Sequence, residues 1–128
     1  MLSRRASLRS AIAALGVGAA LALSAGTPAF AANEGDHWLN TPNCTADQKI
    51  ELHLYNGVYH DAQAIDPTYV NGSCEFVLTD NGSVIYDSTK SSQSPWYYDG
   101  PGHTICAKVT EYNYNGRGTN YTANGVCN

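Results

Sequence analysis

Apolar and polar side chains alternate in several short segments of this chain, with the two-residue period that is typical of a half-buried β-strand. Residues 49–55 and residues 103–112 show the alternation most clearly. Their apolar sides are formed by Ile50, Leu52 and Leu54 and by Ile105, Ala107 and Val109. No stretch after residue 31 combines the apolar period of a helix with helix-capping residues. The pattern therefore predicts an all-β protein.

The dipeptide Asn-Gly occurs five times after residue 31. Both residues tolerate the positive φ angles of a type I′ turn, so the dipeptide favours a two-residue loop between antiparallel strands. Its positions are Asn56-Gly57, Asn71-Gly72, Asn81-Gly82, Asn115-Gly116 and Asn124-Gly125. We therefore expect short strands that reverse repeatedly.

The strongest predicted hairpin joins residues 74–79 to residues 84–88 around Asn81-Gly82. A two-residue loop would set the cross-strand pairs Thr79/Val84, Leu78/Ile85 and Val77/Tyr86. Residues 61–67 are predicted to form a loop, and residues 119–127 a closing hairpin or an edge strand. Taken together, these segments predict six or seven strands.

This number of strands predicts a small antiparallel β-sandwich or a small open barrel. Residues 106–109 are typical of an immunoglobulin-like strand with a framework cysteine, but Thr104 stands where that fold has a tyrosine. We therefore predict an immunoglobulin-like architecture without the hallmarks of the family. Residues 46–128 form one β domain in this prediction, and residues 32–45 form a loose N-terminal leader.

Residues 1–31 have the composition of a signal peptide. Three arginines precede an apolar run over residues 11–24, and Ala29-Phe30-Ala31 supplies the small-x-small pattern of a cleavage site. Ser3-Arg4-Arg5 resembles the start of a twin-arginine signal, while the rest of the segment suits the general secretory route, which we favour. We therefore predict that residues 1–31 are removed and that the remaining chain is secreted and extracellular.

All four cysteines lie beyond the predicted signal peptide. Small secreted domains commonly rely on disulfides, and the absence of a C-x2-C pair does not fit a structural zinc site. Sequential pairing, Cys44–Cys74 and Cys106–Cys127, closes the shortest loops and is the pairing that we expect. Four cysteines allow two other pairings, which the sequence leaves open.

The net charge of the chain indicates which classes of molecule it could bind. After residue 31 there are four basic and eleven acidic residues, so the net charge is four minus eleven, or −7, with histidine neutral. Scattered basic residues argue against binding to nucleic acid and to anionic membranes. A negative surface favours cationic partners. We predict a monomer that binds neither nucleic acid nor membranes.

Groups suited to catalysis are sparse. The histidines are His37, His53, His60 and His103. There is no G-x-S-x-G motif, and paired cysteines offer no thiolate nucleophile. His53 and His60 flank Asn56-Gly57 and could approach each other, but isolated strand histidines are more often solvated than bound to metal. We therefore predict that the protein is not an enzyme and holds no metal or cofactor.

Aromatic residues are the most suggestive feature, because nine tyrosines and two tryptophans remain after residue 31. These side chains combine a flat apolar ring with a polar tip, which is common on recognition surfaces. The candidate binding residues border predicted loops and are Trp96, Tyr97, Tyr98, Tyr112 and Tyr114. We therefore predict a secreted, non-enzymatic protein that binds an extracellular protein or polysaccharide. An inhibitor of an extracellular hydrolase, a carbohydrate or cell-wall binding module and a structural coat component are the narrower alternatives.

Overall fold

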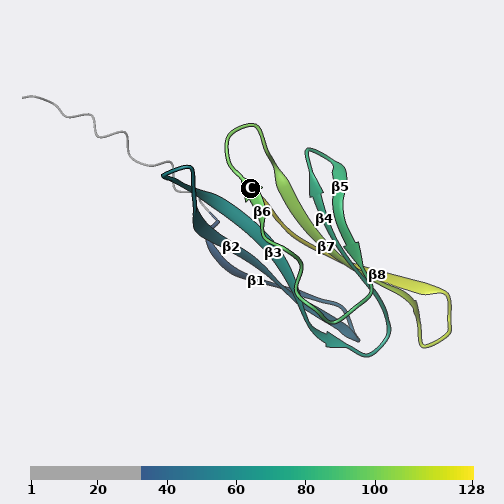
Figure 1. Ribbon diagram of the computed structural model, residues 1–128. Helices are drawn as coiled ribbons and strands as arrows, with labels where there is room; N and C mark the ends of the chain where they lie inside the picture. Colours follow the sequence, from purple (N-terminus) through teal and green to yellow (C-terminus); the bar gives the residue numbers. More distant parts are fainter. Residues whose placement is uncertain (1–32) are drawn as a thin grey trace, which may run out of the picture.

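The computed structural model describes residues 33–128, which form eight β-strands and contain no helix (Figure 1). The strands are β1 (Gly35–Asn40), β2 (Cys44–Tyr55), β3 (Val58–Val70), β4 (Ser73–Asp80), β5 (Ser83–Ser88), β6 (Tyr97–Asp99), β7 (Ile105–Tyr114) and β8 (Thr119–Cys127). The predicted signal peptide lies outside the described residues. The prediction of an all-β protein is confirmed.

The strands form two antiparallel sheets of four strands each, in the orders β1-β2-β3-β6 and β5-β4-β7-β8. We call them sheet A and sheet B. They face each other as two layers, and the β7–β8 hairpin extends beyond the layers at one end of the molecule (Figure 1). The small disulfide-stabilised antiparallel β-sandwich predicted from the sequence is therefore present.

Two Asn-Gly dipeptides form two-residue turns of the kind that the sequence predicts. Asn56 and Gly57 have φ angles of 49° and 79° between β2 and β3, and Asn81 and Gly82 have φ angles of 48° and 84° between β4 and β5. Asn124-Gly125 is different, because it lies within β8. Asn115 and Gly116, between the paired strands β7 and β8, also have positive φ angles, 54° and 67°, whereas Asn71-Gly72 joins β3 to β4 of the other sheet without them. Within the described residues, Asn-Gly therefore has positive φ angles only between strands that pair with each other.

Two segments predicted to be irregular are strands, and these predictions were wrong. Residues 32–45, the expected loose leader, contain β1, which pairs with β2 over six residues from Gly35 to Asn40. Residues 61–67, the expected loop, lie within β3 and pair with β2. The inner face of β3 carries Asp61 and Gln63 between the sheets, and these buried polar residues conceal the apolar alternation on which the strand prediction depends.

The β4–β5 hairpin has the predicted turn but not the whole predicted register. Thr79 lies opposite Val84, as expected, whereas Leu78 lies opposite Tyr86. The register shifts between Leu78 and Thr79, where β5 contributes an extra residue, Ile85, in a β-bulge. The predicted pairs Leu78/Ile85 and Val77/Tyr86 were therefore wrong.

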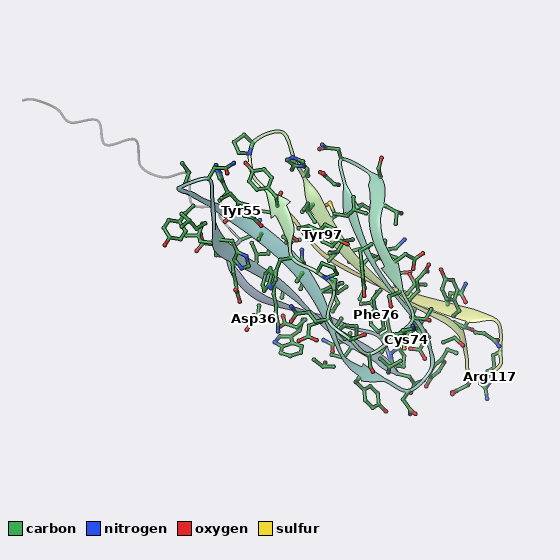
Figure 2. All side chains as sticks on the ribbon, in the orientation of Figure 1. Asp36, Tyr55, Cys74, Phe76, Tyr97 and Arg117 are labelled. Carbon is green, nitrogen blue, oxygen red and sulfur yellow. A yellow bond between two sulfur atoms is a disulfide. The ribbon has the colours of Figure 1, made fainter. Side chains whose placement is uncertain are left out.

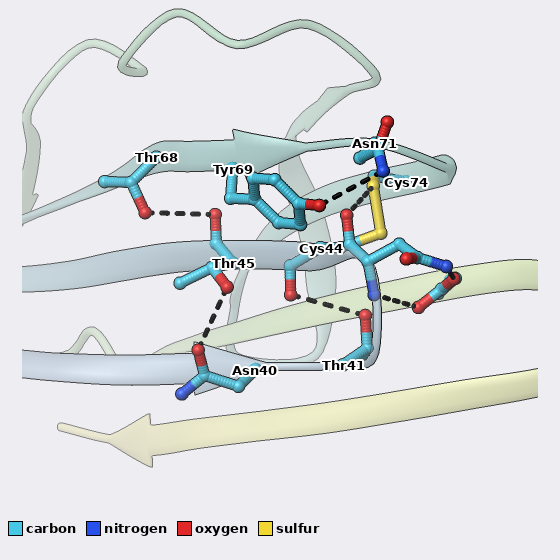
Figure 3. Close-up of a disulfide and its surroundings, with 10 residues drawn as sticks. Asn40, Thr41, Cys44, Thr45, Thr68, Tyr69, Asn71 and Cys74 are labelled. Atoms are coloured by element: carbon cyan, nitrogen blue, oxygen red, sulfur yellow. Dashed lines mark hydrogen bonds between the residues drawn. A yellow bond between two sulfur atoms is a disulfide. The ribbon is translucent and has the colours of Figure 1, made fainter.

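The core fills the space between the sheets and is closed by the Cys44–Cys74 disulfide. Its fully buried side chains include Leu39, Ile65, Phe76, Leu78, Ile105 and Val109. The disulfide joins the first residue of β2 in sheet A to β4 in sheet B (Figure 3). The second disulfide, Cys106–Cys127, joins neighbouring strands of sheet B. Both predicted pairings are confirmed.

A layer of glutamine side chains also connects the sheets. The Gln48 amide nitrogen donates to the Gln63 side-chain oxygen (2.8 Å) and to the Val126 carbonyl (2.8 Å), and the Val126 N–H donates back to Gln48 Oε1 (2.9 Å). Gln63 in turn donates to Asp99 Oδ2 (2.6 Å) and to the Ile105 carbonyl (3.1 Å). The Gln48 side chain thus forms with the Val126 backbone the pair of hydrogen bonds that a neighbouring strand would form, and it holds β8 against sheet A.

Asp61 and Asp99 are cross-strand partners whose carboxyls are buried between the sheets, and the Oδ1 atom of each lacks a hydrogen-bond partner within residues 33–128. Burial raises the pKa of Asp99; the hydrogen bond from Gln63 opposes this rise, and the charge of Asp61 adds to it. The folded protein therefore favours the protonated form of Asp99.

Asp99→Asn should raise the midpoint of thermal unfolding at neutral pH. The stabilising contribution of protonated Asp99 is complete below the unfolded pKa of about 3.9 and is lost as the pH rises through the higher folded pKa. Asparagine keeps an acceptor for Gln63 without the charge, so the gain should shrink towards acidic pH. Thermal unfolding of both proteins from about pH 3 to about pH 8 measures it. Glu34→Gln removes an exposed charge. If it raised the thermal midpoint as much as Asp99→Asn does, the burial of the Asp99 charge would not be the cause of the increase.

Candidate functional site

The three consecutive aromatic residues at β6 do not share one surface, because neighbouring residues of a strand point to opposite faces. Tyr97 pairs with Gln63 on the inner face, and its ring centroid lies 6.4 Å from that of Tyr86 of sheet B. It packs against the core. Tyr98 pairs with Ala62 on the outer face of sheet A. Of these two tyrosines, only Tyr98 belongs to an outer surface.

Tyr112 and Tyr114 lie elsewhere, near the end of β7 that leads into the β7–β8 hairpin. The ring centroids of Tyr114 and Tyr121 are 5.3 Å apart, edge to face, and Tyr112 donates a hydrogen bond to Glu75. Figure 2 shows Arg117, at the tip of this hairpin, and Tyr55, near the β2–β3 turn, at opposite ends of the molecule. The predicted binding residues therefore fall on separate surfaces.

Tyr98 is the centre of an aromatic cluster on the outer face of sheet A. Its ring centroid lies 4.8 Å from that of Tyr55, 5.2 Å from that of His60 and 5.3 Å from that of His103. All three contacts are edge to face, with interplanar angles of 84°, 69° and 88°. This is a preferred geometry for aromatic pairs, so the ring of Tyr98 is held on several sides.

The chain around the cluster is fixed by polar contacts and by one glycine. His103 Nδ1 lies 2.6 Å from Asp80 Oδ2 at the end of β4, and the Asn81 side chain donates to the Gly102 carbonyl (2.8 Å). A Cβ atom at Gly100 would overlap the ring and hydroxyl of Tyr98. Gly100 therefore allows the β6–β7 loop to pass directly against Tyr98.

The cluster continues onto the tip of the β2–β3 hairpin, where large apolar side chains are exposed. Leu54 is 59% exposed, Val58 55% and Tyr59 64%. Val58 lies on the outer face, where it lines a hollow of about 400 Å³ together with Tyr55, Asn56, His60 and Tyr98. Leu54 and Tyr59 are cross-strand partners on the opposite face of the hairpin. We define the hairpin-tip surface as Leu54, Tyr55, Val58, Tyr59, His60 and Tyr98. It combines a hollow on the outer face with exposed apolar groups on both faces of the hairpin end.

Trp96 and His53 extend this face along sheet A, with ring centroids 4.5 Å apart. His53 and His60 are cross-strand partners, as their positions around Asn56-Gly57 suggested. Within residues 33–128 no three histidine, cysteine, aspartate or glutamate side chains converge in a way that could hold a metal ion. The same residues include no helix that could cross a membrane.

Most of the hairpin-tip surface was missed in the sequence, where only Tyr98 was identified. Its other members were interpreted as ordinary strand residues around a turn. One signal was available: Leu54-Tyr55 and Val58-Tyr59 place apolar side chains on both faces of a hairpin next to Asn56-Gly57. A hairpin end can bury only one face against a second sheet, so such a pattern predicts an exposed apolar tip.

Comparison of the chain with protein-family models, with curated proteins and with solved structures finds no match. The two disulfides of the chain fit an oxidising compartment.

Proposed function

We propose that this chain is a secreted, non-enzymatic binding protein that holds an extracellular protein through its hairpin-tip surface. The observation that carries the proposal is the exposed apolar end of the β2–β3 hairpin. Val58 borders a hollow lined by aromatic rings on the outer face, and Leu54 and Tyr59 are exposed on the opposite face. Soluble proteins rarely expose contiguous apolar patches without a binding role. Aromatic anchors in a pocket with an apolar surround are typical of protein interfaces.

A protein suits this surface better than a polysaccharide does. Leu54 and Val58 are aliphatic and present no flat ring or polar atom to a sugar. Tyr98 is already fixed by its ring contacts, so little side-chain entropy would be lost on binding. A polysaccharide is the second candidate, because the rings of Tyr55 and Tyr98 border an open hollow in which a sugar could stack.

Tyr98→Ala should weaken binding by about 30-fold, the loss of about 2 kcal/mol that is usual for a central aromatic anchor. The wild-type chain would first capture proteins from the extracellular fraction of a producing culture. The dissociation constant of the purified partner would then be measured by surface plasmon resonance, and insoluble polysaccharides would be tested in parallel.

Two further variants make this test specific. Val58→Ser changes an exposed tip residue and should also weaken binding, whereas Tyr112→Ala removes an exposed tyrosine from the other hairpin and should not. Circular dichroism would check that each variant is folded. Unchanged affinity in both Tyr98→Ala and Val58→Ser would reject the hairpin-tip surface, and retention by polysaccharide alone would favour the second candidate.

A further inference from the structure

A second feature of the outer face lies near the other end of β2. Trp38 is 59% exposed on β1, and its cross-strand partner is Asp47. Asp36 precedes Trp38 by two residues on the same strand, so the indole and both carboxyls share one face of sheet A. Figure 2 shows Asp36 at the sheet A side of the molecule, away from the core residue Phe76.

Asp47 is unusual for a residue on the outer face of a sheet. It is only 4% exposed, and its Oδ1 atom has no hydrogen-bond partner within residues 33–128. Burial raises the pKa of Asp47, and the nearby charge of Asp36 adds to the rise. A buried carboxyl oxygen without a partner costs stability, and such costly groups cluster at binding sites.

Lys49 lies near this pair of carboxyls, and its charge lowers the pKa of Asp47, but its ammonium group bonds neither of them. Lys49, the cross-strand partner of Asp36, instead bonds Asp66 Oδ2 on β3 at 2.8 Å and Gln93 Oε1 at 3.1 Å. None of the ion pairs formed within residues 33–128 includes Asp36 or Asp47. No three metal-ligating side chains converge in this range either. The pair therefore suits an organic cation better than a metal ion.

We propose that Trp38, Asp36 and Asp47 form a receptor for an arginine side chain of a protein partner. A guanidinium group is planar, so it can stack on the exposed indole while its N–H groups donate to the exposed carboxyl of Asp36 and point towards the buried carboxyl of Asp47. The net charge of −7 for residues 32–128 favours the approach of a basic segment. This receptor lies six residues along β2 from His53, about 20 Å from the aromatic cluster. The inference does not rest on the hairpin-tip surface.

Isothermal titration calorimetry with a short blocked peptide containing two arginines tests the receptor. The same peptide with citrulline, which is uncharged, should bind at least about 10-fold more weakly. Trp38→Leu keeps apolar area but removes the indole ring, and it should weaken arginine-peptide binding by about 5-fold or more. Asp47→Asn should weaken binding to a similar extent and should raise the thermal midpoint, because it removes a buried charge.

Two control variants test whether the arginine peptide binds at this receptor and not through the overall negative charge or the hairpin-tip surface. Asp87→Asn removes one acidic charge from β5 of sheet B and should leave peptide binding unchanged. Val58→Ser should also leave it unchanged, so that failure of the hairpin-tip surface remains distinguishable. Equal binding of the citrulline peptide, or an equal loss in Asp87→Asn, would overturn the proposal. Binding of a neutral oligosaccharide that is lost in Trp38→Leu, without binding of the arginine peptide, would overturn it as well.

Discussion

Replacing both Cys44 and Cys74 by serine should lower the free energy of unfolding by about 3–5 kcal/mol. The bond joins sheet A to sheet B and links residues 30 apart in sequence, so its loss releases a long loop in the unfolded chain. Both sulfur atoms are buried, and serine would place hydroxyl groups in the core. Since a domain of this size is stable by only about 5–15 kcal/mol, urea unfolding should show a much lower midpoint.

The matched comparison is the same change at Cys106 and Cys127. These residues face each other on neighbouring strands of one sheet, their sequence separation is 21, and Cys127 is exposed. The loss should be smaller, about 3 kcal/mol, because the loop is shorter and the core is less disturbed. A larger loss for this pair than for Cys44 and Cys74 would contradict the view that the inter-sheet bond contributes more.

The sequence predicted the fold well where local chemistry determines the structure. Asn56-Gly57 and Asn81-Gly82 determine their turns through their own tolerance of positive φ, and the alternation in residues 105–109 directly identifies the buried face of β7. The sequence was misleading where buried polar groups replace apolar ones. Asp61 and Gln63 in β3 form hydrogen bonds to residues that are distant in sequence and come close only in the folded protein, so the segment resembled a loop.

The candidate site was harder to predict because it depends on contacts between distant segments. Tyr98 meets Tyr55 and His60 only after β6 pairs with β3 in the order β1-β2-β3-β6. No spacing in the sequence reveals that order. The same applies to Asp36 and Asp47, which become neighbours of Trp38 only once β1, predicted as a loose leader, pairs with β2. The aromatic composition led to the prediction of a binding surface, but the strand order determines which aromatic rings lie close together.

One dipeptide predicted as a turn signal has a different role. Asn124-Gly125 lies inside β8, where a Cβ atom at Gly125 would overlap Gln48 Oε1. That oxygen accepts the Val126 N–H, and the Gln48 amide donates to the Val126 carbonyl. Glycine here leaves space for a side chain from the opposite sheet. The backbone of Gly125 is outside the left-handed region, so an alanine would be disfavoured by space and not by conformation.

Gly125→Ala should therefore lower the free energy of unfolding by about 2–4 kcal/mol, because the displaced Gln48 amide would lose its bonds to Val126 in a buried setting. Urea unfolding measures the loss, and Asn124→Ala, at the exposed neighbouring position, should have little effect. A double-mutant cycle identifies the cause. In a Gln48→Ala background, Gly125→Ala should cost much less, giving a coupling energy of about 2 kcal/mol. If the cost were the same in both backgrounds, the loss would come from the strand itself, and Gln48 would not be what holds β8 to sheet A.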